Sequence, residues 1–216
     1  MLNWDCKEWS HLFTTFENYQ ILLINNEEEL MAYGHTIPIY WDEDIRFIPD
    51  NLKILMEMAV KNNKDGIRPN LLLALAAVVS EDYKGKGLSY EVVNAMKIFA
   101  SKNKIEDVII PVRPTLKAKY PLISIDDYVR WENKDGKPFD PWLRVHKKLG
   151  GKVVKTAEIS MIIRGKINEW EKWTNTVICG SGKYIFEDSL NPVEIDIEKN
   201  EGIYTDPCVW IHYSLK

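Results

Sequence analysis

The residues best suited to chemistry form a glycine-containing run between a long apolar segment and a helical one. The run Val79–Ser89 reads VSEDYKGKGLS, and Lys84, Gly85, Lys86 and Gly87 lie at its centre. Backbone N–H groups at a helix N-terminus have no partner inside the helix, and the helix dipole adds positive charge there. Glycines let a ligand approach the backbone closely. The run therefore predicts a cradle for an anion, and a phosphate or pyrophosphate is the expected one.

Two common nucleotide-binding motifs do not fit this run. A Walker loop requires GxxxxGK[ST], which the sequence lacks. A Rossmann fingerprint requires GxGxxG, whereas Gly87 is followed by Leu88, Ser89 and Tyr90. The sequence therefore predicts a phosphate-containing ligand that is bound by neither motif.

The segments around the glycines predict a strand, a turn, a helix and a second strand. Leu71–Val79 is apolar without alternation, and its flanking turn residues favour a strand buried on both faces. Gly87–Lys102 carries one apolar stripe, as a helix does. Val108–Val112 is expected to be another buried strand. This order predicts two parallel strands with a right-handed connection, and a ligand at the carboxyl end of the first.

Further elements are expected along the rest of the chain. Asp140–Gly151 is expected to be a helix that Asp140 caps and the final glycines end. A strand over Leu30–Tyr40 is expected to be broken by Gly34 and Pro38. The other expected strands are 19–24, 152–155, 159–164, 193–197 and 204–213, and the other expected helices are 51–61, 124–131 and 167–173.

Composition and charge limit the classes of function. The 216 residues are 45% hydrophobic and 28% charged, which is typical of a globular protein. A net charge of −4 argues against a nucleic-acid partner. No apolar run approaches the ~20 residues of a membrane helix, and the N-terminus lacks a signal-peptide pattern. We expect a cytoplasmic protein without a membrane partner.

Cysteine and tryptophan usage adds two expectations. Cys6, Cys179 and Cys208 form no CxxC pair, so neither a disulfide framework nor a zinc site is expected, and no metal is assigned. Eight tryptophans indicate either a large aromatic core or an aromatic-lined pocket, and the sequence favours the core.

The glycine run resembles a motif of the GNAT superfamily of acyl-CoA N-acyltransferases, V-x-P-x-Y-R-G-x-G-x-G/A. Lys84 and Ser89 depart from it, since the family has Arg or Gln and Gly or Ala at these places. In the family, backbone amides of this loop bind the pyrophosphate of CoA. The resemblance implies acetyl-CoA or another acyl-CoA as co-substrate here. The implied binding residues are Val79, Lys84, Gly85, Lys86, Gly87, Leu88 and Ser89.

A second run is similar to the end of a GNAT helix, A-x-x-x-Y-E-K-L-G-F. Trp142–Gly151 reads WLRVHKKLGG and follows the glycine run at the family's distance, apart from an insertion over 114–139. The resemblance covers residues 70–155 well and the rest by general plan. It implies a single GNAT-like α/β domain over residues 1–216, with a mixed, centrally parallel sheet and helices on both faces.

Two residues are candidates for catalysis. His146 stands where the family often has a tyrosine that acts as general acid. Helical geometry turns His146 toward the apolar side, so it is either a core histidine or a proton donor to the CoA thiolate or base for the amine. Tyr120 either reaches the thioester or packs on Pro121. The amine attacks the thioester directly, so no enzyme nucleophile is required.

Residues for the acceptor are less sharply defined. His35, beside Gly34, either lines the acceptor pocket or is a satisfied strand histidine. Arg113, at a strand end, is a candidate for binding a substrate carboxylate. The acidic run Asp42–Asp44 is better explained as a solvated loop than as a metal or amine site.

The function that these motifs indicate is transfer of an acetyl or other acyl group from CoA to a small-molecule or peptide amine. One alternative is a non-catalytic acyl-CoA-binding or sensing module, because Asn70–Leu72 lacks the carboxylate that some family members use as base. Another is an acyltransferase that uses an acyl-carrier protein, whose phosphopantetheine arm needs no adenine site. The acceptor is not identified by the sequence.

Overall fold

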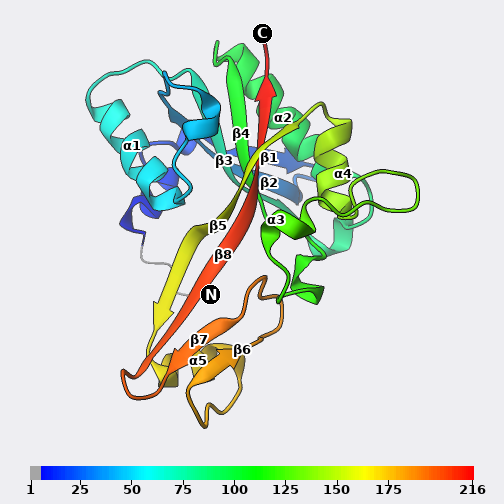
Figure 1. Ribbon diagram of the computed structural model, residues 1–216. Helices are drawn as coiled ribbons and strands as arrows, with labels where there is room; N and C mark the ends of the chain where they lie inside the picture. Colours follow the sequence, from blue (N-terminus) through cyan, green and yellow to red (C-terminus); the bar gives the residue numbers. More distant parts are fainter. Residues whose placement is uncertain (1–5) are drawn as a thin grey trace. The chain divides into compact units, whose positions relative to one another are not determined.

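The computed structural model describes residues 6–216 as two compact parts of one chain (Figure 1). The first, which we name the glycine-loop part, comprises residues 7–111, 145–155 and 210–216. The second, which we name the tryptophan-core part, comprises residue 6 and residues 112–144 and 156–209.

The glycine-loop part is built on a mixed sheet. Strand β1 (Ile21–Ile24) pairs antiparallel with β2 (Leu30–Ile39), and β2 pairs antiparallel with β3 (Leu71–Val79). Strand β4 (Asp107–Val112) joins β3 in parallel. The strand order continues from β4 to β8 (Glu201–Ser214). The predicted mixed sheet with a parallel pair at its centre is therefore confirmed.

Two long helices pack on this sheet. Helix α1 (Leu52–Lys64) contacts β2, and helix α2 (Leu88–Lys102) contacts β1, β2 and β3. Gly34 allows α2 to approach β2 closely, because a Cβ at this position would lie 2.2 Å from Cε of Met96. The side chains that the two helices bury are Leu55, Met56, Ala59, Val92, Val93, Met96 and Ala100.

The tryptophan-core part contains paired strands and short helices. β6 (Gly182–Tyr184) pairs with β7 (Val193–Asp196), β7 pairs with β8, and β5 (Lys152–Gly165) also pairs with β8. Helix α5 (Ile167–Thr174) places Trp170 in the core of this part. The other buried members of that core are Ile163, Ile178, Val193, Ile195 and Tyr204.

The segment 114–139 is attached to the start of helix α4 (Pro141–Lys148) by one buried carboxylate. Asp140 is 1% exposed and caps α4, since Oδ1 accepts from the N–H of Trp142 at 2.9 Å. Oδ2 accepts from the hydroxyl of Tyr128 at 2.9 Å and from the N–H of Leu116 at 2.8 Å. The predicted cap is confirmed, and the same side chain fixes the insertion, including helix α3 (Ile125–Tyr128).

Several predicted elements differ in extent from the observed ones. The strands predicted at 152–155 and 159–164 are one continuous strand, β5, which pairs with β8. The break predicted at Gly34 and Pro38 is absent, since β2 is continuous and only shifts register between His35 and Thr36. The first strand begins at Ile21, because a 3₁₀ turn occupies Glu17–Tyr19.

Candidate functional site

Strands β3 and β4 pair only at their beginnings. Leu73 and Ile109 form the last parallel pair, yet β3 continues to Val79 and β4 to Val112. Pro111 helps to end the ladder because proline has no backbone N–H to donate. The edge of β3 beyond Leu73 is therefore not paired with β4.

The burial of β3 follows the same division. Leu71 to Ala74 are buried, whereas Ala77 and Val78 are exposed. The prediction that this strand is buried on both faces along its length is wrong for its second half. The exposed half begins where pairing with β4 has ended, although β2 still pairs with Ala76 to Val79.

Strand β3 has a β-bulge close to the point where its pairing with β4 ends. On the side that faces β2, His35 is opposite Ala76 and Thr36 is opposite Ala74, which makes Leu75 the extra residue. A bulge bends the strand, increases its twist and changes the direction of nearby backbone groups. The bulge at Leu75 therefore changes the backbone direction at the beginning of the exposed half of β3.

The loop after β3 is held by the β1–β2 hairpin. The N–H of Ser80 donates to the carbonyl of Met31 at 2.9 Å. The hydroxyl of Tyr83 donates to Oε2 of Glu29 at 2.7 Å, and Nδ2 of Asn25 donates to the same hydroxyl at 3.0 Å. The Tyr83 hydrogen bond lowers the pKa of Glu29, which keeps the carboxylate ionised as an acceptor. These contacts fix the direction in which the loop leaves the strand.

The glycines of the loop expose a row of backbone amides. Gly85 (φ 77°) and Gly87 (φ 80°) adopt left-handed conformations that favour glycine. Gly87 is the N-cap of α2 and provides no side-chain hydrogen bond. Within residues 6–216 no acceptor is recorded for the amides of residues 85–89. A Cβ at Gly85 or Gly87 would meet nothing within 4 Å, so the loop is open at both glycines. Such amides and the dipole of α2 are suited to an anion, and the cradle expected from the sequence stays a prediction.

The two lysines of the loop are exposed, and each already has a neighbour. Nζ of Lys84 lies 2.6 Å from Oε1 of Glu81, and both side chains are mostly exposed. Nζ of Lys86 lies 4.5 Å from the centroid of the Tyr83 ring. An exposed pair of this kind is weak, so both ammonium groups can turn toward an anion in the loop.

His146 lies in the core of the glycine-loop part. Its side chain is 0% exposed, and Nδ1 lies 2.6 Å from the hydroxyl of Tyr213. Burial lowers the pKa of His146 to about 4 and raises that of Tyr213. A neutral imidazole at pH 7 has no imidazolium proton to give to a thiolate. The geometry favours a core histidine, and a catalytic role for His146 stays a prediction.

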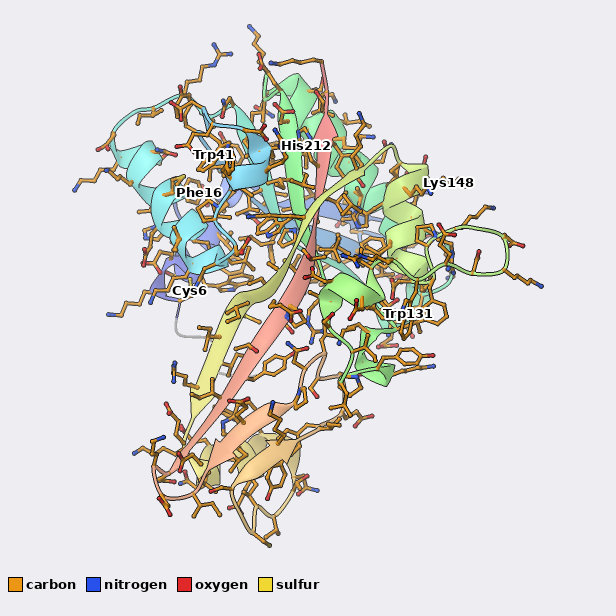
Figure 2. All side chains as sticks on the ribbon, in the orientation of Figure 1. Cys6, Phe16, Trp41, Trp131, Lys148 and His212 are labelled. Carbon is orange, nitrogen blue, oxygen red and sulfur yellow. The ribbon has the colours of Figure 1, made fainter. Side chains whose placement is uncertain are left out.

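Tyr120 and His35 are surrounded by aromatic rings. In the tryptophan-core part, the half-buried Tyr120 has its ring centroid 4.9 Å from that of Trp131, which is labelled in Figure 2, and 5.9 Å from that of Phe139. In the glycine-loop part, Nδ1 of His35 lies 2.9 Å from Oε1 of Gln20, and burial lowers its pKa. The rings that flank His35 are Trp9, Phe13 and Tyr33. Both residues have packing partners, and their assigned roles stay predictions.

Arg113 is bound to a buried carboxylate that the sequence analysis did not single out. Nε of Arg113 lies 2.9 Å from both carboxylate oxygens of Asp206, whose side chain is 4% exposed. Nη2 donates to the carbonyl of Asp188 at 3.1 Å and contacts the hydroxyl of Tyr204 at 3.4 Å. Burial is the largest single influence and acts to lower the pKa of Arg113, but the charges and hydrogen bonds of Asp206 and Tyr204 together outweigh it and raise the pKa. No acceptor is recorded for Nη1 among residues 6–216, and a role of Arg113 in binding a substrate carboxylate stays a prediction.

Tyr204 and Asp206 were missed although the sequence carries a signal for them. They are two residues apart in β8 and therefore face the same side of the strand. The hydroxyl of Tyr204 donates to Oδ1 of Asp206, and burial together with that charge raises the pKa of Tyr204 to about 12. A tyrosine and an aspartate two residues apart in an apolar strand indicate a buried polar cluster. The pattern does not identify the arginine that pairs with the aspartate.

A cavity of about 760 Å³ lies beside this cluster in the tryptophan-core part. Its wall includes Arg113, Asp206 and the rings of Trp170, Trp173 and Phe186. Among residues 6–216, no group of three or more His, Cys, Asp or Glu side chains is placed to hold a metal ion. Over the same residues, no helix is long and apolar enough to cross a membrane.

One curated relative resembles the chain along most of its length. The arginine N-acetyltransferase avaD of Aspergillus versicolor is 28% identical over 233 aligned positions, which cover 95% of this chain and 80% of the relative. No protein-family model matches the chain.

Two solved structures share the fold. The loading GNATL domain of CurA from Lyngbya majuscula superposes with a TM-score of 0.60 at 13% identity, over 97% of this chain and 82% of that one. The GphF GNAT-like decarboxylase in complex with isobutyryl-CoA superposes with a TM-score of 0.56 at 16% identity, over 95% of this chain and 83% of that one. The chain has the fold of the GNAT acyltransferases, and the resemblance seen in the sequence is confirmed.

Proposed function

We propose that this protein is an acyl-CoA-dependent N-acyltransferase that transfers an acetyl group to the guanidinium or amino group of arginine or of an arginine-like compound. The carrying observation is the row of amides at residues 85–89, which begins α2 and follows the open half of β3. The similarity to the arginine N-acetyltransferase avaD supports transfer to a nitrogen and suggests the acceptor.

The amide row is suited to the pyrophosphate of CoA. Five consecutive N–H groups and the helix dipole provide fixed positive potential, and Lys84 and Lys86 add mobile charge. Val79, Leu88 and Ser89 lie at the two ends of the same loop. The predicted set of cofactor residues is therefore one continuous segment.

The open edge of β3 is suited to the pantetheine arm. Pantetheine is an extended chain with two amide groups, so it can pair with a strand edge as a peptide strand does. Beyond Leu73, β3 has such an edge because β4 no longer pairs with it. The bulge at Leu75 changes the direction of amides there, and such amides are candidates to stabilise the oxyanion.

The reaction needs little from the side chains. The acceptor nitrogen attacks the thioester carbonyl carbon, the new C–N bond forms, and the C–S bond breaks to release the CoA thiolate. One proton leaves the nitrogen, and the thiolate takes up one proton from solvent or a nearby group. Independence from metals, a cytoplasmic location and a single domain over residues 1–216 stay predictions, as does an acyl-carrier protein in place of CoA.

Turnover with defined acceptors tests this proposal. The purified protein is mixed with acetyl-CoA and, separately, with arginine, agmatine, lysine or tryptamine, while CoA thiol release and product mass are measured together. We expect thiol release and one added acetyl group with arginine or agmatine. Tight CoA binding without an acetylated product would instead support the sensing module. Acetyl transfer only to a phosphopantetheinylated carrier protein, in competition with free CoA, would support the carrier alternative.

A further inference from the structure

The cavity beside Arg113 has rigid aromatic walls. The rings of Trp170 and Trp173 meet edge to face with centroids 5.2 Å apart, and Phe186 stacks on Trp170 at 6.0 Å with an interplanar angle of 11°. Nε1 of Trp170 donates to the carbonyl of Gly202 at 2.9 Å. A Cβ at Gly202 would lie 2.3 Å from the Trp170 ring, so the glycine is required for this packing. The rings are therefore held in place before any ligand arrives.

The charges around the cavity are unevenly compensated. Asp206 is neutralised by Arg113. Glu187 and Asp188 also line the cavity, both are exposed, and no hydrogen bond or ion pair of either carboxylate is recorded within residues 6–216. Asp188 has a φ of 61°, and its carbonyl accepts from Nη2 of Arg113, which holds this loop against the cavity wall. The carboxylates of Glu187 and Asp188 therefore give the cavity wall an excess of negative charge.

We propose that this cavity recognises the cationic side chain of the acceptor, with the guanidinium over the face of Trp173 and beside the carboxylate of Glu187. Guanidinium groups stack on aromatic rings and pair with carboxylates, so both wall features favour the same ligand. The volume of about 760 Å³ lies within the usual range for small-molecule pockets. This inference rests on the proposed function, because it assigns the acceptor class.

An anionic or purely apolar ligand fits these observations less well. An anion would face two carboxylates without counter-charge, and the one guanidinium of the wall, Arg113, is already paired with Asp206. An apolar ligand would pack against the aromatic rings, but it would offer no partner to the carboxylate of Glu187. Thr174 and Thr176 also line the cavity, and because their hydroxyls donate to the carbonyls of Trp170 and Thr174, their oxygens remain as acceptors for a cation.

Two ligands of equal shape and different charge test the inference. Arginine amide and citrulline amide differ in that a neutral ureido group replaces the guanidinium. Each is titrated calorimetrically into the wild-type protein and the Glu187→Gln variant, with and without CoA. Glu198→Gln is the matched control, because Glu198 is also exposed in the tryptophan-core part but does not line this cavity. Trp173→Leu reports on the ring, with circular dichroism to confirm folding.

The expected result is that arginine amide binds at least about 10-fold more tightly than citrulline amide. Glu187→Gln should reduce arginine amide affinity about 5-fold or more and leave citrulline amide unchanged, while Glu198→Gln changes neither. Equal binding of the two amides, no arginine amide binding under either condition, or no effect of Glu187→Gln would overturn the pocket assignment.

Failure of the pocket and failure of the proposed function give different results. If the protein acetylates arginine and Glu187→Gln leaves the KM for arginine unchanged, the proposed function stands and the assignment of the cavity is wrong. Binding of arginine amide that depends on Glu187, without acetylation of any amine, would keep the pocket and contradict the proposed function.

Discussion

Nδ1 of His146 and the hydroxyl oxygen of Tyr213 lie 2.6 Å apart in the core of the glycine-loop part. Lys97 adds to this cluster, since its Nζ lies 5.0 Å from the centroid of the Tyr213 ring and donates to the carbonyl of Leu149 at 2.9 Å. The helix that resembles the GNAT motif is thus joined to the last strand by a buried polar pair. Because His146 has this buried partner, its structural and catalytic roles predict different effects of substitution.

The first prediction concerns stability and pH. The folded protein holds His146 neutral down to a pKa of about 4, whereas the unfolded chain takes up a proton near the ordinary value of 6.5. The unfolded state therefore binds more protons between these values, and the free energy of unfolding falls as the pH falls through this window. The full difference is about 3 kcal/mol. Urea denaturation from pH 7.5 to 4 should show this loss in the wild type and a flatter profile in His146→Gln. Parallel profiles for the two proteins would contradict it.

The second prediction separates the two roles of His146. His146→Ala should lower the free energy of unfolding by about 1–3 kcal/mol, because it removes the partner of the buried Tyr213 hydroxyl. The kcat per folded molecule should stay near the wild-type value. A general acid would instead lose about 10²–10⁴ in kcat. Melting temperature and kcat are measured on the same preparation, and a large fall in kcat with an unchanged melting temperature would restore the catalytic role.

The third prediction concerns the amide row. Gly87→Glu places a carboxylate and a strained left-handed residue where the pyrophosphate should bind, so CoA affinity should fall by at least about 100-fold. Gly66→Glu is the matched control, because Gly66 has a φ of 67° and equally open space but lies at the end of α1. Both variants carry the same strain and charge, so only Gly87→Glu should lose CoA in a calorimetric titration. Equal CoA affinity in the two folded variants would remove the loop from the CoA site.

The fourth prediction concerns the buried carboxylate of the tryptophan-core part. Asp206→Asn removes the charge that pairs with Arg113 and weakens the acceptor for Tyr204, so the free energy of unfolding should fall by about 2 kcal/mol. Asp196→Asn breaks an exposed pair with Lys199 and serves as the control, with a smaller expected effect. Urea denaturation of both variants measures the difference. Equal losses would show that burial of Asp206 adds nothing to the ion pair.

Local features of the chain were largely predictable from the sequence. The strand, glycine turn and helix over Leu71–Lys102 follow from apolar patterning and from the glycines, and the structure places them as expected. The cap at Asp140 follows from its place before Pro141. These features depend on neighbours within a few residues, which periodicity and capping rules describe.

Features that depend on distant pairing were not predictable. The early end of the β3–β4 ladder at Leu73 and Ile109 depends on the relative direction of two strands, and no residue type marks it except Pro111. The partner of Arg113 lies 93 residues later in the chain. The short strand β6 was missed because its three residues are too few to show alternation.

Hydrogen–deuterium exchange with and without acetyl-CoA tests the central claim most directly, because it reports on the backbone groups that should hold the ligand. The account predicts slower exchange in two segments on binding: residues 85–89, whose amides should receive the pyrophosphate, and residues 75–79 of β3, whose free edge should pair with the pantetheine arm. Peptides covering α1 and β7 should exchange at the same rate in both states. Saturating acetyl-CoA that leaves residues 75–79 and 85–89 unprotected would contradict the claim that this loop and strand edge form the acyl-CoA site.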